Sequence, residues 1–492
     1  MQRGAGILMP ISSLPSEYGI GTFGKAAFDY VDFLKEAGIK YWQLLPLGPT
    51  SYGDSPYSSF SSFAGNPYFV DFDILIEEKK ITKAEVSKYE WGSNPRYVDY
   101  GKLFEGRFEV LKLAKERTWE KEQPQISKFI SESGAWLENY ALFMAIKKHF
   151  KMKPWQEWPD EDIRLRRGNS VNEYKAKLQE DIELYIYIQY EFYNQWAKLR
   201  KYINDAGIKI IGDLPIYVAL DSADVWAESK WFWLDEKNVP VKIAGVPPDY
   251  FSKDGQLWGN PLYDWQAMKN DGYGWWIRRI EGARKLFDII RIDHFRGFYE
   301  YWAVPAKDKT AVNGQWMKGP NMEFINAIKG WFGGLEFIAE DLGEYNPGVD
   351  QMLLDSGFPG MKVLEFGFTA GQQSGYMPHN YPVNCVCYTG THDNATVEEW
   401  KDAASKKDVD YAMDYLGTMK NEKFSWSMIK GGMRSVAILF VAQMQDYLGL
   451  GKYNRINEPG TVGDNWQWRM LKGEASKELA KSIRNIVSMY GR

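Results

Sequence analysis

The sequence predicts a (β/α)8 barrel that carries large, mostly helical insertions. Along the 492 residues, eight short apolar runs alternate with helical patterns. This alternation is typical of a parallel sheet that is covered by helices, and eight repeats favour a closed barrel. Several of these runs also end in charged residues, as barrel strands often do at the rim where they finish.

In chain order, the predicted strands are 6–11, 41–47, 208–218, 288–295, 335–342, 361–366, 384–394 and 435–448. Each is a short run of strand-forming residues that ends in polar or turn residues. Helical patterns lie between most of them, for example AAFDYVDFLKEAG at 26–38 and NMEFINAIKGWF at 321–332. The last run, SVAILFVAQMQDYL, is equally compatible with a helix, because the periodicity of a short apolar run does not decide between the two.

The spacing of the strands predicts one domain, 1–492, with two inserted subdomains. About 160 residues separate strands two and three, and about 70 separate strands three and four. The first insertion, approximately 51–207, is largely helical and includes a Tyr-rich amphipathic run at 171–206. No internal repeat or low-complexity linker divides the chain.

The second insertion, approximately 219–287, is rich in tryptophan. Exposed aromatic rings stack on the flat apolar faces of sugars. Clustering of these rings in the core is an equally good interpretation. The residues concerned are Trp226, Trp231, Trp233, Trp258, Trp265, Trp275 and Trp276.

Composition excludes several classes of protein. A net charge of −5 gives no electrostatic reason to expect nucleic acid or an anionic membrane as a partner. No stretch reaches about 18 apolar residues, and two cysteines cannot form a disulfide framework. We expect a cytoplasmic protein, either a monomer or a small homo-oligomer.

No cofactor or metal is predicted. GIGTFGKA at 19–26 approaches a phosphate-binding P-loop, but Ala26 replaces the hydroxyl residue that would hold magnesium. The four histidines show no zinc-binding spacing. A glycine-rich turn that enters a helix explains the motif better.

Charged side chains fall at the ends of four predicted strands. Asp213 ends strand three, Asp293 strand four, Glu340 strand five, and His392 with Asp393 strand seven. Any one of them is explained by a strand-end cap or a structural ion pair. Because the carboxyl ends of barrel strands meet at one rim, all four are expected to converge there, which favours an active site.

Two of these carboxyl groups differ in their surroundings. Side chains two apart on a strand share a face, so Arg291 points the same way as Asp293 and favours its ionised form. Glu340 has no cation in its own strand and is the better candidate for a protonated acid. A carboxylate nucleophile beside a carboxyl acid/base is typical of retaining glycoside chemistry, which needs roughly 5–5.5 Å between the two groups.

Long blocks of the sequence resemble the amylomaltases, the 4-α-glucanotransferases of glycoside hydrolase family 77 in the α-amylase clan. The blocks at the strand ends are RIDHFRG, IAEDLG and GTHDN. Further blocks are SSLPSEYGIGTFG, LLPLGPTSYGDSPYSSFSSFAGNP, GDLPIYVALDSADVWA, GVPPDYFSKDGQLWGNPLYDW and RINEPGTVGDNWQWR. The resemblance covers nearly the whole chain and shows no departure at the catalytic blocks.

The resemblance implies a role for each matching residue. Asp293 is the nucleophile, Glu340 the acid/base and Asp393 the carboxylate that stabilises the transition state. Arg291 orients the nucleophile, His392 and Asp213 bind the sugar at the cleaved bond, and Tyr57 stacks on that sugar. Asp249, Trp258 and Asn260 lie on a loop that covers the cleft between donor and acceptor, and Asn465 and Trp466 lie on a second loop.

The implied reaction is retaining transfer of an α-1,4-glucan segment, through a covalent glycosyl-enzyme, to the 4-hydroxyl of glucose or a malto-oligosaccharide. Two alternatives stay open: a hydrolase of α-1,4-glucans with the same carboxylates, and a non-catalytic glycan-binding barrel. His294 either binds sugar or packs structurally, and Arg296 forms either part of the site or a loop ion pair.

Overall fold

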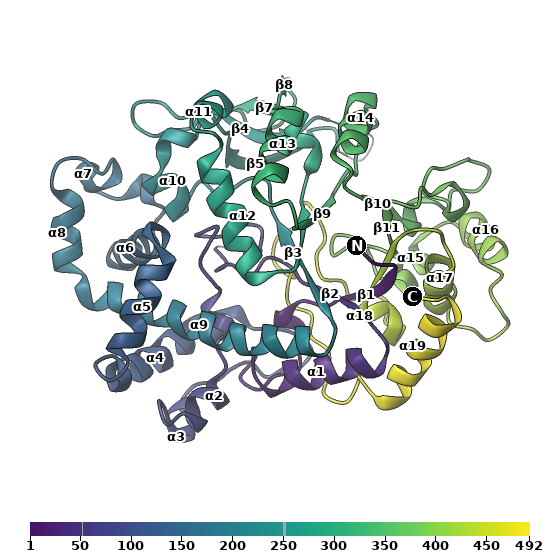
Figure 1. Ribbon diagram of the computed structural model, residues 1–492, viewed down its shortest axis with the longest axis horizontal. Coiled ribbons are helices and arrows are strands. Elements are labelled where there is room, and N and C mark those ends of the chain that lie inside the picture. The colour runs from purple at the N-terminus through teal and green to yellow at the C-terminus, as the bar shows by residue number, and fades with distance from the viewer. Residues whose placement is uncertain (52, 249–251) are drawn as a thin grey trace.

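The computed structural model describes residues 1–51, 53–248 and 252–492. All eight predicted strands are present in one parallel sheet (Figure 1). Their order is β10 (Gly360–Val363), β11 (Cys385–Tyr388), β12 (Leu439–Gln443), β1 (Gly4–Leu8), β2 (Tyr41–Gln43), β3 (Lys209–Leu214), β6 (Ile289–Ile292) and β9 (Glu336–Ala339). The amide of Ala339 donates to the Pro359 carbonyl at 2.9 Å, so the end of β9 meets the start of β10 and the predicted barrel is nearly closed.

Helices cover the outside of the barrel. They are α1 (Lys25–Glu36), α9 (Gln179–Asp205), α12 (Gly274–Leu286), α13 (Asn321–Trp331), α14 (Pro347–Ser356), α15 (Val397–Ala403), α16 (Lys406–Leu416), α17 (Phe424–Met433) and α19 (Lys477–Met489). The predicted helices at 26–38 and 321–332 are α1 and α13. The ambiguous run at 435–448 contains both structures, because β12 is followed directly by α18 (Met444–Leu448).

Alternate residues of each strand belong to two separate apolar layers. Ile211, Ile289 and Ile338 point into the barrel and pack with one another in its interior. Ile290 and Ile292 point outward into the larger core beneath the helices. This alternation follows from the two-residue period of a strand, and it fixes which side chains reach the rim.

The stretch between β2 and β3 is helical, as expected. It contains α2 (Phe72–Glu77), α3 (Lys83–Val86), α4 (Tyr100–Thr118), α5 (Gln123–Ser133), α6 (Ala135–His149), α7 (Glu161–Arg164) and α8 (Ser170–Lys177) before α9. The amphipathic run predicted at 171–206 is therefore split between α8 and α9. The hydroxyl of Tyr202 near the end of α9 donates to Asp32 of α1 at 2.7 Å, which fixes α9 against the barrel wall.

A second, antiparallel sheet was not anticipated from the sequence. Its order is β5 (Gln256–Pro261), β4 (Lys242–Val246), β7 (Glu300–Pro305) and β8 (Gln315–Lys318). Two of its strands precede β6 and two follow it, so the sheet joins segments on either side of the strand that leads to Asp293. The short helices α10 (Ala223–Ala227) and α11 (Trp265–Asn270) flank its first half.

Most of the clustered tryptophans belong to the core. Trp226, Trp231, Trp275 and Trp276 are buried, and Trp233 and Trp265 pack partly buried against the same core. Trp258 differs from these because 37% of its surface is exposed. The core interpretation therefore holds for the cluster as a whole, and Trp258 alone of the seven is an exposed ring. Among the described residues, no helix has the length and apolarity needed to span a bilayer.

Candidate active site

The strand-end carboxylates stand directly above the apolar interior of the barrel. Asp213 lies two residues beyond Ile211 on β3, and Glu340 lies two residues beyond Ile338 at the end of β9. On β6, Arg291 and then Asp293 continue the inward-facing positions that begin with Ile289. The strand register pairs Ile292 with Ala339. Asp293 and Glu340 therefore follow a matched pair of positions and lie on neighbouring strands.

Arg291 links two aspartates at this rim. It pairs with Asp213 across the β3–β6 register, and its Nη1 lies 2.7 Å from both carboxylate oxygens of Asp213. The same Nη1 donates to Asp293 Oδ1 at 2.9 Å. Burial alone would lower the pKa of Arg291, but the charges of Asp213 and Asp293 raise it well above its usual value. Arg291 is thus a permanent cation that holds and orients Asp293.

Glu340 has a different environment. Its Oε2 accepts from the His294 amide at 2.7 Å and its Oε1 from the Leu342 amide at 2.8 Å. Burial raises the pKa of Glu340 to about 8, and nearby Asp293 adds to the shift, although Arg291 and the two amide hydrogen bonds oppose it. A carboxyl group with this pKa is protonated at neutral pH and can donate a proton.

His294 supplies its amide because of its backbone conformation. The residue lies in the left-handed region, with φ 51° and ψ 50°, directly after the strand, and this turn directs its N–H at Glu340. Burial lowers the pKa of the His294 ring to about 4. The ring packs edge-to-face with Trp258, with centroids 4.9 Å apart.

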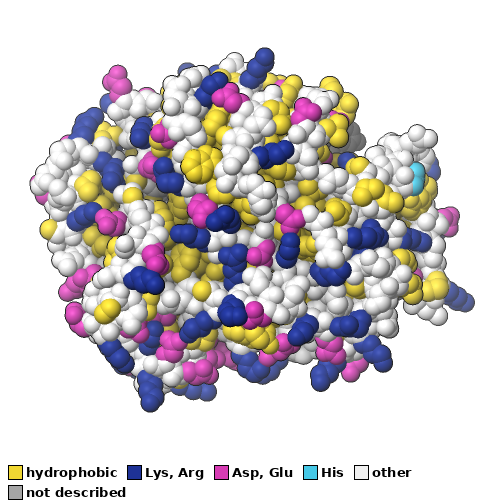
Figure 2. All heavy atoms as spheres, in the orientation of Figure 1, with side chains coloured by type: hydrophobic (Ala, Val, Ile, Leu, Met, Phe, Trp, Pro, Cys, Tyr) yellow, Lys and Arg dark blue, Asp and Glu magenta, His cyan; other side chains and the backbone are white. Residues whose placement is uncertain are grey.

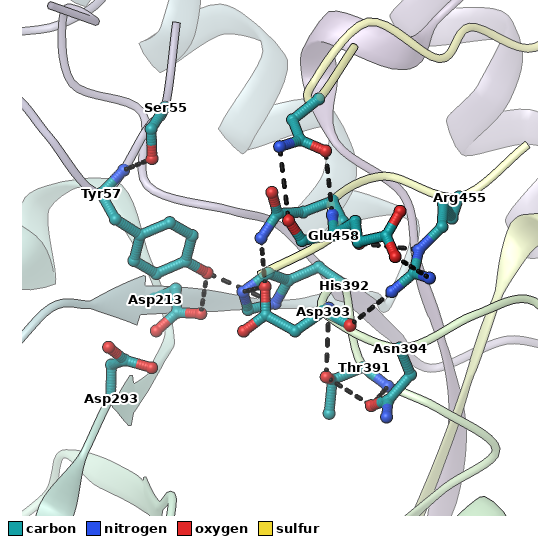
Figure 3. A network of polar contacts seen from close by, with 12 residues as sticks. Ser55, Tyr57, Asp213, Asp293, Thr391, His392, Asp393, Asn394, Arg455 and Glu458 are labelled. Carbon is teal, nitrogen blue, oxygen red and sulfur yellow. Dashed lines mark hydrogen bonds and ion pairs between the residues drawn. The ribbon is translucent and has the colours of Figure 1, made fainter. Parts of the chain in front are cut away.

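A second polar group lies across the rim (Figure 3). The Tyr57 hydroxyl donates to Asp213 at 2.8 Å and lies 3.4 Å from His392 Nδ1. The Tyr57 and His392 rings are stacked at 4.9 Å with 14° between their planes. His392 Nε2 lies 3.3 Å from Asp393 Oδ1, which also accepts from Asn457 at 2.7 Å. These contacts tie the loops after β2, β11 and α18 into one wall.

An open cleft of about 520 Å³ lies above these residues. Asp293 and Asp393 line its floor region, while Trp258 and Asn260 of β5 and Trp466 line its sides. The Asn260 amide group is fixed by donation to the Val218 carbonyl at 2.8 Å. The cleft thus combines aromatic surfaces with carboxylates and an imidazole, a combination that suits a polyhydroxylated ligand.

Comparison with known proteins agrees with this geometry. The sequence profile of glycoside hydrolase family 77, described as 4-alpha-glucanotransferase, matches residues 9–474. The chain belongs to the 4-alpha-glucanotransferase family. The 4-alpha-glucanotransferase of Clostridium butyricum is 46% identical over 98% of this chain and 100% of its own length. That of Thermus thermophilus is 44% identical over 100% and 99%.

A solved structure supports the same assignment. Amylomaltase from Streptococcus agalactiae, in complex with acarbose, matches with a TM-score of 0.98 and 42% identity, covering 100% of both chains. The predicted (β/α)8 fold and the resemblance to family 77 are both confirmed.

In this 4-alpha-glucanotransferase chain, the structure gathers most of the predicted site residues around one cleft. The predicted residues that line it are Tyr57, Trp258, Asn260, Asp293, His392, Asp393 and Trp466. Asp213 and Arg291 are bonded to the lining residues Tyr57 and Asp293, and Glu340 follows the strand next to Asp293. Asn465 points elsewhere: its side chain bonds Glu458 and Thr461 within its own loop. Asp249 lies outside the described residues.

Further residues shape the site without having been singled out from the sequence. Asn457 contacts Asp393, and Arg455 donates to the Asp393 carbonyl at 3.0 Å. Both belong to the block RINEPGTVGDNWQWR. The sequence identifies this block, but it does not show that these two residues contact Asp393. Arg296 bonds Glu300 at 2.6 Å and the Glu344 carbonyl at 2.7 Å, which makes it a loop ion pair.

Proposed function

We propose that this member of the 4-alpha-glucanotransferase family transfers α-1,4-glucan segments with Asp293 as nucleophile and Glu340 as acid/base. The observation that carries the proposal is the contrast between two neighbouring carboxyl groups. Asp293 is ion-paired with Arg291 at 2.9 Å, whereas burial raises the pKa of Glu340 to about 8. One group is equipped to attack and the other to give up a proton.

In the first step, an Asp293 oxygen bonds to C1 of the donor sugar as the C1–O bond to the leaving sugar breaks. Glu340 gives its proton to the leaving oxygen, and a glycosyl-Asp293 ester remains. In the second step, Glu340 takes the proton of the acceptor 4-hydroxyl, whose oxygen bonds to C1 and releases Asp293. The two inversions retain the α configuration, and the proton returns to Glu340.

The other residues act on the sugar at the cleaved bond. Asp393 lines the cleft with its carboxylate held by Asn457, a position from which it can stabilise positive charge that develops on the sugar ring. The buried groups of Asp213 and His392 and the ring of Tyr57 supply hydrogen bonds and a stacking face. These assignments rest on the family resemblance and on the convergence of the side chains.

Transfer requires that the acceptor reach the glycosyl-enzyme before water does. The rings of Trp258 and Trp466 line the cleft, and ligand stacking on such surfaces excludes water. We propose α-1,4-glucans and malto-oligosaccharides as donors, and glucose or malto-oligosaccharides as acceptors. A cytoplasmic location and a monomeric or small homo-oligomeric state remain predictions.

Incubation with maltotriose tests the proposal. A transferase yields glucose and a ladder of longer oligomers while the number of reducing ends stays constant. A rising number of reducing ends would favour the hydrolase instead.

Asp293→Asn should abolish turnover but leave maltotriose binding intact. Asp205→Asn, which removes an exposed ion pair on α9, is the matched control and should keep full activity. Undiminished turnover by Asp293→Asn would refute the nucleophile assignment. Binding without turnover by the unaltered protein, on any glucan, would favour the non-catalytic alternative.

A further inference from the structure

A second, larger hollow lies on the outer wall of the molecule. Its volume is about 1020 Å³, and it lies between helices α5, α6 and α9 of the insertion and the barrel helices α12 and α13. None of its lining residues lines the catalytic cleft. Figure 2 shows hydrophobic side chains gathered on this face, with charged groups among and around them.

Small residues form part of the wall of this groove. Gly134, Ala135, Ala197 and Gly282 line it where the two groups of helices approach. A methyl group at Gly282 would lie only 3.0 Å from Phe63 Cδ1. Gly282 therefore lets α12 pack closely against Phe63, which forms part of the groove wall.

Aromatic rings supply flat surfaces in this groove. Phe63 and Trp136 are nearly parallel, with centroids 6.0 Å apart and 15° between the ring planes, and Tyr193 packs against Trp136 at 5.9 Å. Trp331, at the end of α13, is 68% exposed. A tryptophan is usually largely buried, so Trp331 presents an unusually free face for stacking.

The charged groups around the groove balance one another. Its lining includes Glu132, Glu228 and Glu281 and also Arg278, Arg284 and Lys285. Arg278 pairs with Glu228 at 2.7 Å and Arg284 with Glu281 at 3.3 Å. Three anions beside three cations create little net field, which disfavours a phosphate or a nucleic acid. They still offer both hydrogen-bond donors and acceptors, which neutral vicinal hydroxyl groups require.

The groove extends away from the reacting centre. Lys285 is at the end of α12, just before β6 begins, and Trp331 is at the end of α13, just before β9 begins. Asp293 and Glu340 follow the opposite ends of the same two strands. A ligand at this end of the groove is therefore separate from the sugar at the catalytic rim. Its volume is about twice that of the catalytic cleft, which suits a chain of several sugar rings.

We propose that this groove binds a second stretch of an α-1,4-glucan, with Trp331 and Trp136 as stacking surfaces. The choice of glucan rests on the proposed function, since a polymeric donor is long enough to occupy two separate sites. The groove would then raise the affinity for long chains by multivalent attachment, and it would contribute nothing to a trisaccharide bound at the catalytic rim.

The test compares long amylose with maltotriose. Relative to the KM for maltotriose, the KM for amylose should rise about three- to tenfold in Trp331→Ala. This is the effect expected from the loss of one aromatic contact. Trp331→Ala should also reduce the retardation of the protein in gels that contain amylose. Because Trp331 is largely exposed, the variant should fold. Trp331→Phe, which keeps a flat ring, should restore most of the retardation.

Phe104→Ala is the matched control, because Phe104 is an aromatic residue 52% exposed on α4 that does not line the groove. Equal changes in Trp331→Ala and Phe104→Ala, or equal changes with both substrates, would overturn the proposal. So would a dimer of the unaltered protein that Trp331→Ala dissociates, because the groove would then be an interface between copies.

The same gels separate the two proposals. Retardation is measured for Asp293→Asn with and without Trp331→Ala, so that no turnover is needed. If the unaltered protein shows no glucan turnover but Trp331→Ala still lowers retardation, the proposed reaction is refuted and the proposed glucan site in the groove is supported. If turnover is normal and retardation does not depend on Trp331, only the groove proposal fails.

Discussion

At the scale of single residues, the main feature of the site is that two aspartates share one cation, Arg291. Arg291 Nη1 contacts both Asp213 and Asp293, so the arginine satisfies a buried carboxylate and positions a partly exposed one. A lone buried carboxylate would be costly. Placing the guanidinium between the two aspartates leaves Asp293 free to face the cleft.

The acid/base assignment makes a pH prediction. The first step needs protonated Glu340, whose pKa is about 8. Activity should therefore persist below pH 8 and fall as the pH rises through that value, in a profile of kcat/KM against pH.

Glu340→Gln should remove the alkaline fall and lower kcat roughly 10²- to 10⁴-fold, the usual contribution of general acid catalysis. With α-maltosyl fluoride, whose fluoride leaves without a proton, formation of the glycosyl-enzyme should be much less impaired. An alkaline fall that survives in Glu340→Gln would show that another group titrates there.

At the scale of elements, the turn from β11 to α15 positions His392 and Asp393. Asp446, just beyond β12, accepts from the Thr389 hydroxyl at 2.6 Å and from the Val397 amide at 2.9 Å. These two bonds hold both ends of the turn. Gln443 adds a bond to the Ala395 carbonyl at 3.2 Å. A neighbouring barrel strand thus fixes a loop that carries catalytic groups.

Replacing Asp446 should therefore affect catalysis from a distance. Asp446→Asn loses one of the two acceptor oxygens, so one buried donor is left unpaired at a cost of about 1–3 kcal/mol in the free energy of unfolding. Movement of Asp393 should lower kcat for maltotriose about tenfold or more with a smaller change in KM. Urea unfolding and steady-state kinetics measure the two effects.

Asp408 offers a matched control. It accepts the Ala370 amide at 2.7 Å and the Ser405 hydroxyl at 2.6 Å, at the start of α16, and it does not line the cleft. Asp408→Asn should cost stability and leave kcat unchanged. An equal loss of kcat in both variants would mean that the effect of Asp446 is not specific to the catalytic turn.

At the scale of the whole molecule, Arg492 ties together segments that are far apart in sequence. Its guanidinium donates to the carbonyls of Gly4 at the start of β1, Met433 at the end of α17 and Ala437 before β12. It also bonds Gly432 and Ser435. The side chain is buried, and it shares the carbonyls of Met433, Ser435 and Ala437 with Arg3.

Arg492→Ala should lower the free energy of unfolding by roughly 1–3 kcal/mol, because the hydrogen bonds of a buried, charged donor to several carbonyls are lost. Arg484→Ala is the control: Arg484 also donates to backbone carbonyls, Lys35 and Glu36, but on the exposed surface, where water replaces it. The urea midpoint at constant m-value measures both. Equal midpoints for the two variants would contradict the prediction.

Much of the fold and of the catalytic floor was predictable because it depends on local pattern. The eight strand positions follow from short apolar runs. The alternation of residues along the strand indicates that Ile289, Arg291 and Asp293 face inward. The second sheet was not predictable, because its two local pairs, β4–β5 and β7–β8, are joined by the pairing of β4 with β7, about 60 residues later in the chain. The tryptophans were equally ambiguous, since composition does not report burial.

The sequence by itself therefore determined the barrel, its family, and the strand-end residues Asp213, Asp293 and Glu340, since each follows from the periodicity of one strand or from a contiguous motif. Tertiary structure alone decided that one Arg291 nitrogen contacts two aspartates, that His294 turns its amide toward Glu340, and that Tyr57 stacks on His392. It also decided that Asn465 faces its own loop. These outcomes depend on contacts between segments distant in sequence, which only the packed chain brings together.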